Sequence, residues 1–193
     1  MWVVLRSLSV YGEISEEYQV NGGIVMDKDY QIRRVKPGDE SILARIQTES
    51  WKAAFKDIVE EELLRKSTDL DRATDMYRKL LEQQIGNGYI LEVKGAAHCI
   101  AWWDAVRDAD LNGYAELICI HSLPGNWRRG YGSRMMETVL RDAAAAGFRN
   151  IVLWVFEENE RARRFYEAHG FVKTDRTKIG LGAVEVMYAR SIA

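Results

Sequence analysis

The stretch 127–133 combines two glycines and two arginines, and it reads Trp-Arg-Arg-Gly-Tyr-Gly-Ser. It lies between a strand-like and a helix-like pattern. Glycines let the backbone curl so that consecutive N–H groups point at one spot. The helix that follows adds its own unsatisfied N–H groups and the positive end of its dipole. Together with Arg128 and Arg129, these groups suit a phosphate or pyrophosphate, although a helix start that uses glycine only for close packing is the alternative.

A second patterned stretch, 159–171, follows the next strand and reads Asn-Glu-Arg-Ala-Arg-Arg-Phe-Tyr-Glu-Ala-His-Gly-Phe. Asn159 has the side chain of a helix N-cap, and Gly170 is a typical helix stop. Between them the apolar face consists of Ala162, Phe165, Tyr166 and His169. On local grounds alone, this stretch is an amphipathic helix packed on a core.

Hydrophobic periodicity supplies the elements around these motifs. We predict strands at 30–35, 89–93, 98–105, 114–122, 150–156, 171–176 and 183–189. We predict helices at 132–146, at 159–169 and in three pieces between 39 and 85, with Asp39 as a helix N-cap. This order predicts a mixed α/β sheet in which one helical crossover joins two parallel strands. Trp102 and Trp103 are neighbours on a strand, so their rings should point to opposite faces.

Taken together, the two motifs resemble the GNAT superfamily of N-acetyltransferases. The resemblance extends to 50–55, Ser-Trp-Lys-Ala-Ala-Phe, and to 115–121, Ala-Glu-Leu-Ile-Cys-Ile-His, and it covers roughly residues 30 to 190. It implies an α/β fold with a mostly antiparallel twisted sheet, a splayed central parallel strand pair and helices on both faces. The family usually has Gln or Arg three residues before the first glycine, where this chain has Trp127. We expect Arg128 and Arg129 to replace that charge.

By this resemblance, acetyl-CoA is the co-substrate. Its pyrophosphate would be held by the backbone amides of Arg128, Arg129, Gly130, Tyr131, Gly132 and Ser133. Its pantetheine arm would bond to backbone groups of Ile120, His121 and Ser122, and to Asn159. Tyr166 would face the thioester sulfur.

The same resemblance implies an N-acetyltransferase in which a primary amine attacks the thioester directly in a ternary complex. The catalytic candidates are Tyr166, which would protonate the leaving thiolate, and Glu116, which would act as a base through water. His121 is a weaker base candidate, and strict alternation along the strand would put it on the face opposite Glu116. A non-catalytic acyl-CoA sensor is the alternative, and it would need neither Glu116 nor Tyr166. A nucleotide-binding protein is disfavoured, because the turn is followed by no Gly-Lys-Ser/Thr and lacks the GxGxxG spacing.

The composition limits which partners, cellular locations and cofactors we expect for this protein. The 193 residues carry a formal net charge of -2 and no strongly basic or acidic half, so we expect no nucleic-acid partner. No apolar run is long enough to span a membrane. Cys99 and Cys119 have no CxxC spacing, no residues have recognised metal-site spacing, and we expect a cytoplasmic protein without a metal. The acceptor is a small-molecule or peptide amine of open identity, and the exposed final strands are compatible with a homodimer.

Residues 1–28 show weak periodicity and are expected to form an N-terminal extension, with the acetyltransferase domain at 29–193. Translation could begin at Met1 or at Met26, and the residue pattern allows both.

Overall fold

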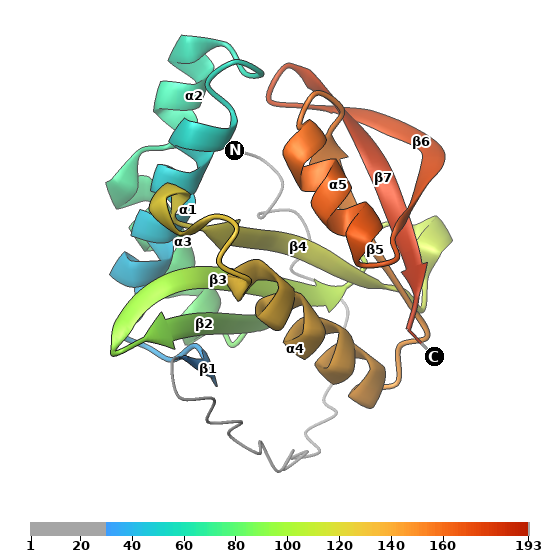
Figure 1. Cartoon of the computed structure of the whole chain (residues 1–193), viewed down its shortest axis with the longest axis horizontal. Coiled ribbons are helices and arrows are strands. Elements are labelled where there is room, and N and C mark those ends of the chain that lie inside the picture. The colour runs from blue at the N-terminus through green and yellow to red at the C-terminus, as the bar shows by residue number, and fades with distance from the viewer. Residues whose placement is uncertain (1–29, 193) are drawn as a thin grey trace.

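The structure is a computed structural model that describes residues 30–192. The predicted extension at 1–28 lies outside the described residues. Seven strands and five α-helices follow the predicted order (Figure 1). The strands are β1 (Gln31–Arg34), β2 (Asn87–Val93), β3 (Ala96–Ala105), β4 (Ala115–Ser122), β5 (Asn150–Phe156), β6 (Val172–Gly180) and β7 (Ala183–Ser191). The helices are α1 (Glu40–Ala54), α2 (Glu61–Ser67), α3 (Leu70–Glu82), α4 (Tyr131–Ala145) and α5 (Glu160–Ala168).

The strands form one sheet in the order β1-β2-β3-β4-β5-β7-β6. Neighbours are antiparallel except β4 and β5, which are parallel and are joined through α4. The parallel pairing covers only Ala115 with Ile151 and Glu116 with Val152. Beyond Glu116 the two strands separate, so β4 keeps only its β3 partner and its other edge faces a gap. The predicted fold class, with its splayed central pair, is confirmed.

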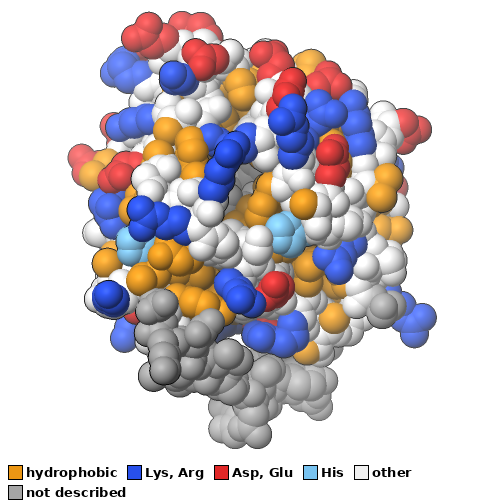
Figure 2. Space-filling view, viewed as in Figure 1, with side chains coloured by type: hydrophobic (Ala, Val, Ile, Leu, Met, Phe, Trp, Pro, Cys, Tyr) orange, Lys and Arg blue, Asp and Glu red, His pale blue; other side chains and the backbone are white. Residues whose placement is uncertain are grey.

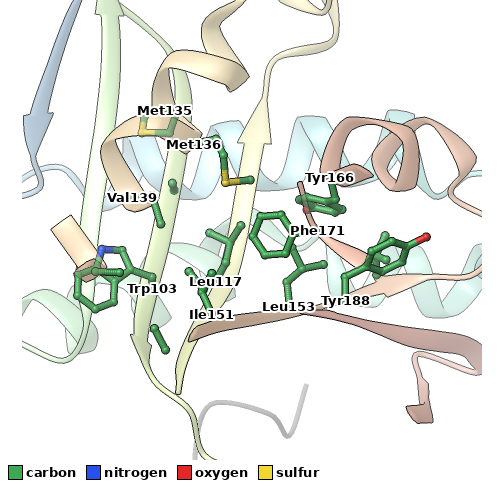
Figure 3. Packing of buried hydrophobic residues seen from close by; sticks show 14 of the residues in the cluster. Trp103, Leu117, Met135, Met136, Val139, Ile151, Leu153, Tyr166, Phe171 and Tyr188 are labelled. Atoms are coloured by element: carbon green, nitrogen blue, oxygen red, sulfur yellow. The ribbon is translucent and has the colours of Figure 1, made fainter. Parts of the chain in front are cut away.

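Helices cover both faces of the sheet, and the core is divided accordingly. On one face, α1 and α3 pack over the first half of the sheet around Ile46, Tyr77 and Trp102. On the other face, α4 and α5 bury Met136 and Tyr166 against the sheet (Figure 3). Trp102 and Trp103 do point to opposite faces, and both are core residues at 4% and 3% exposure.

A β-bulge at Ile118 corrects one expectation about β4. Leu117 pairs with Trp103 and Cys119 pairs with Trp102, so Ile118 has no partner opposite it in β3. Residues beyond a bulge change face relative to strict alternation. Glu116 and His121 therefore share the face covered by α1 and α3, and the prediction that they lie on opposite faces is wrong. They are still five residues apart, about 16 Å at the usual strand rise, so distance keeps them from acting on the same atom.

Two other local expectations need correction. Asp39 precedes α1, but its side chain makes no cap bond. It instead accepts hydrogen bonds from Arg33 at 2.7 and 2.9 Å and from the Lys36 amide at 2.8 Å. Strand β6 runs to Gly180 rather than stopping at 176, because it pairs with β7 over most of its length.

Among the described helices, none combines the length and apolar character needed to cross a bilayer.

Candidate active site

The glycine-rich turn has two residues in the left-handed conformation before α4, one on each side of Arg129. Arg128 has a φ of 64° and Gly130 a φ of 81°. The helical ladder starts with the bond from the Arg134 amide to the Gly130 carbonyl at 3.1 Å, and no side chain of the described residues caps the helix. The amides of Tyr131, Gly132 and Ser133 thus come before the ladder begins, whereas side chains cap α2, α3 and α5. The uncapped turn is suited to an anionic ligand.

The two glycines of the turn have different tasks. Gly130 needs its left-handed conformation, and nothing lies within 4 Å of where a Cβ would stand. At Gly132, a Cβ would come 3.3 Å from the ring of Phe165, so this glycine lets α4 approach α5 closely. Both interpretations of the turn, close packing and free amides, therefore hold at separate residues. Arg128 and Arg129 are exposed beside it.

Trp127 departs from the family pattern, and the structure shows what surrounds it. Its indole Nε1–H donates a 2.9 Å hydrogen bond to the Ser122 carbonyl. The guanidinium of Arg161, from the first turn of α5, lies 3.3 Å over the centre of its ring. Within residues 30–192, the side chain of Arg161 makes no ion pair or hydrogen bond. A cation absent from position 127 is thus held over Trp127 by stacking, a contribution that spacing along the sequence does not reveal.

Asn159 combines a structural role with a place in the cleft. It is 8% exposed, and its Oδ1 caps α5 by accepting from the Ala162 amide at 3.2 Å. The side-chain NH₂ group has no partner among the described residues, and Asn159 lines a cleft. The capping role expected from local physics is present, and the amide donors are free for a ligand.

Tyr166 projects from α5 into the core next to Phe171 (Figure 3). Its ring also meets that of Phe165 edge to face. The residue is 9% exposed, and burial raises its pKa well above the usual value for a phenol, with Cys119 as a second cause. Its hydroxyl has no hydrogen-bond partner in the described chain, yet no polar side-chain atom there is both fully buried and unpaired. The hydroxyl therefore reaches accessible space, and Cys119 of β4 is near enough to affect its pKa. It is a protonated donor facing the region where β4 and β5 separate.

The second half of β4 is the segment that was predicted to bind a pantetheine arm. Ile120 to Ser122 pair with β3 on one side, and no strand within residues 30–192 pairs with them on the other. The Ser122 carbonyl already accepts from Trp127. The imidazole Nε2 of His121 accepts from the indole Nε1–H of Trp51 at 3.2 Å, and burial lowers the pKa of His121 to about 4. His121 is therefore a neutral side chain in contact with α1.

Glu116 lies at the closed end of the gap, where β4 and β5 are still paired. It is 6% exposed and accepts from Arg107 Nη2 at 2.8 Å and Arg107 Nε at 3.2 Å. Asp104 lies opposite it in β3, and burial raises the pKa of Asp104. This cluster of two carboxylates and one arginine could not be predicted from the sequence, because the register between β3 and β4 depends on the bulge.

A cleft of about 700 Å³ opens between the end of α1 and the start of α5. Figure 2 shows the surface hollowed between these two sides of the molecule. Its walls are the segment from Ala53 to Ile58, Trp127, and the segment from Glu158 to Arg161. Asn159 and Trp127 were singled out from sequence, whereas Arg161 was not. In the described part of the chain, no three His, Cys, Asp or Glu side chains are grouped so that they could hold a metal ion.

Comparisons with known proteins fit this geometry. The PaiA N-acetyltransferase from Thermoplasma acidophilum, solved in complex with coenzyme A, superposes with a TM-score of 0.72 at 16% identity, covering 84% of this chain and 98% of that one. The putative acetyltransferase yncA from Salmonella typhimurium, solved with acetyl-CoA, gives 0.65 at 16% identity, with 85% and 94% covered. An N-acetyltransferase from Staphylococcus aureus Mu50 gives 0.65 at 16% identity, with 85% and 99% covered. These likenesses show a shared fold.

A search of curated proteins found no match. The family model described as "Acetyltransferase (GNAT) family" matches residues 47–171, which include the second half of α1, the uncapped turn and α5. The chain therefore belongs to the GNAT acetyltransferase family, whose general activity is transfer of an acetyl group from acetyl-CoA.

Proposed function

We propose that this protein is an N-acetyltransferase in which a primary amine attacks acetyl-CoA directly in a ternary complex. The observation that carries the proposal is the hydroxyl of Tyr166, which is accessible beside the gap between β4 and β5 and has no hydrogen-bond partner within residues 30–192. A module that only binds acyl-CoA needs the gap and the turn, but it does not need a protonated phenol aimed at the gap.

In this proposal the cofactor runs from the turn into the gap. The free amides from Arg128 to Ser133 hold the pyrophosphate, and Arg161 adds positive charge from its stacked position over Trp127. The pantetheine arm lies along the unpaired edge of β4 from Ile120 to Ser122. The NH₂ group of Asn159 donates to an oxygen of that arm.

The catalytic roles follow from the two protons that must move, one from the amine and one to the leaving thiolate. An alkyl amine with a pKa of about 10.4 is neutral in only about one molecule in 2500 at pH 7, a cost of about 4.6 kcal/mol. Such an amine must lose a proton, and the thiolate that leaves must gain one. Burial keeps the Tyr166 hydroxyl protonated at neutral pH, so it is available as the proton donor to sulfur. Backbone N–H groups on the free edge of β4 can stabilise the tetrahedral oxyanion.

Glu116 is the proposed base, and its surroundings define how it would act. Its carboxylate is bound by Arg107 at the closed end of the gap, so any proton must reach it through water. Removing its charge by Glu116→Gln would then slow turnover about 10- to 100-fold with little change in acetyl-CoA binding.

The acceptor remains a small-molecule or peptide amine, and a homodimer through the last strands is a further expectation. The function is tested by mixing the protein with acetyl-CoA and a panel of alkyl amines, amino-acid amides, aminoglycosides and peptides while following free thiol. Amine-dependent thiol release supports the enzyme. Tight coenzyme A binding with no turnover on the whole panel would instead favour the sensor.

A further inference from the structure

The contact between Trp51 and His121 joins α1 to β4 on the side of the sheet opposite α4 and α5. The indole Nε1–H of Trp51 donates to the imidazole Nε2 of His121 at 3.2 Å. The two rings meet edge to face, with centroids 6.1 Å apart and planes at 80°. Trp51 also packs on Phe55, which in turn contacts Phe156 at the end of β5.

This contact fixes which nitrogen of His121 carries the proton. An indole N–H can only donate, so Nε2 must offer its lone pair. Burial lowers the pKa of His121 to about 4, so the ring is neutral at pH 7. A neutral imidazole with a free lone pair on Nε2 has its proton on Nδ1. His121 is thereby a hydrogen-bond donor through Nδ1 and has no lone pair left to serve as a base.

The Nδ1–H group is available to a ligand. It has no hydrogen-bond partner among residues 30–192, and no described polar side-chain atom is both buried and unpaired, so Nδ1 touches accessible space. His121 follows the bulge in β4, on the face of α1, whereas Tyr166 reaches the sheet from the face of α5. The imidazole and the phenol thus approach β4 from opposite sides.

We propose that Trp51 locks His121 as an Nδ1–H donor that binds an oxygen of the amine acceptor, beside an apolar wall of Trp51, Phe55 and Phe156. This inference rests on the proposed function, because it assigns the acceptor to the side of β4 opposite Tyr166. The attacking nitrogen uses its lone pair on the thioester carbon, so it cannot also accept a hydrogen bond. The donor therefore selects amines that carry a carbonyl or hydroxyl oxygen near the nitrogen and an apolar body, such as an α-amino amide with an apolar side chain.

The protonation state can be measured without any turnover. The chain has three histidines, so a two-bond ¹H–¹⁵N correlation spectrum of ¹⁵N-histidine-labelled protein is simple to interpret, and His121→Phe assigns the signal. We expect the Nδ1–H pattern for His121 at pH 7, and a mixture of the two neutral forms in Trp51→Phe. An Nε2–H or doubly protonated ring in the unsubstituted protein would overturn the proposal.

The role in acceptor selection is tested with phenylalaninamide and 2-phenylethylamine, which differ by a carboxamide. We expect His121→Phe to lower the kcat/KM of phenylalaninamide relative to that of 2-phenylethylamine about tenfold, because the hydrogen bond to the carboxamide is lost. The two amines differ in basicity, but this difference is the same for both protein variants and cancels in the comparison. His121→Asn places an amide donor near the position of Nδ1 and should keep the ratio within about threefold. Phe55→Leu is the matched control, since it alters the apolar wall and should affect both amines alike.

The results distinguish a failure of this inference from a failure of the proposed function. An unchanged ratio in His121→Phe, or acetylation of other amines but neither of these two, would overturn the assignment of the acceptor. If no amine of any kind is acetylated, the proposed function fails, while the spectrum still reports whether Trp51 locks His121.

Discussion

The two sides of the β4–β5 gap are built from different parts of the chain. On the side of α4 and α5, the proposed donor site consists mainly of backbone: free amides after Gly130, the open edge of β4 and one phenol. On the side of α1, the proposed acceptor site consists of side chains, with Trp51 and Phe55 around a neutral His121. Backbone amides look alike in any sequence, whereas an aromatic wall with one fixed donor depends on which side chains occupy these positions. On this proposal, the fold determines how acetyl-CoA is recognised, and a few side chains determine how the acceptor is recognised.

The largest effect should come from removing the phenol on the donor side. Tyr166→Phe takes away the proton donor to the leaving thiolate, and kcat should fall about 10²- to 10³-fold while the KM for acetyl-CoA changes little. Steady-state kinetics checks this. Tyr188→Phe is the control from the same core cluster, because it removes a hydroxyl that bonds Arg163 and Glu167 outside the gap. If both variants lose activity equally, Tyr166 is structural.

The next effect concerns the backbone of the turn. Gly130→Ala forces a Cβ into a φ of 81°, so the amides should lose their common direction and the Kd for coenzyme A should rise about tenfold. Gly113→Ala is a matched control, since Gly113 has a φ of 89° with nothing within 4 Å and lies in the β3–β4 connection. Titration calorimetry with coenzyme A on both variants distinguishes a local change in the turn from a general loss of stability. Equal loss of affinity would mean that general destabilisation, not the turn, causes the change.

A smaller effect should follow from the stacked cation. Arg161→Ala removes the charge above Trp127, and the Kd for coenzyme A should rise about three- to tenfold at low salt and less at high salt. Arg164→Ala removes an arginine from the same helix whose partner is Glu160, and its Kd should stay within twofold. An identical response of the two variants would show that α5 acts only through its net charge.

The smallest effect concerns stability on the acceptor side. Burial lowers the pKa of His121 from 6.5 to about 4. Between these two pH values the imidazole is therefore mostly protonated in the unfolded chain and mostly neutral in the folded chain. Stability should therefore fall as the pH drops from about 6.5 towards 4, and His121 contributes nothing to this slope at higher pH. Urea unfolding at pH 7 and pH 5 should show a smaller loss for His121→Phe. Burial and nearby arginines also lower the pKa of His98, so part of the slope remains. An unchanged slope would contradict a neutral His121.

The order of strands and helices followed from sequence because periodicity and turn residues are local. The uncapped turn, the cap at Asn159 and the burial of Tyr166 were likewise predictable, since each depends on a residue type at a fixed spacing. The bulge at Ile118 was not, because it depends on how β4 pairs with β3. For the same reason the Arg107–Glu116 pair, the Trp51–His121 bond and the Arg161–Trp127 stack were missed. Each joins segments that only the folded sheet brings together.

Direct attack on acetyl-CoA is tested most directly by intact-mass spectrometry with trideuteroacetyl-CoA, with and without an amine that supports thiol release. Burial raises the pKa of Cys119 to about 12 and that of Cys99 further, so neither thiol is suited to carry an acetyl group. We predict labelled amide and free coenzyme A in equal amounts when the amine is present, with no label on the protein in either sample. Labelled protein that accumulates without amine and is discharged when amine is added would contradict the account.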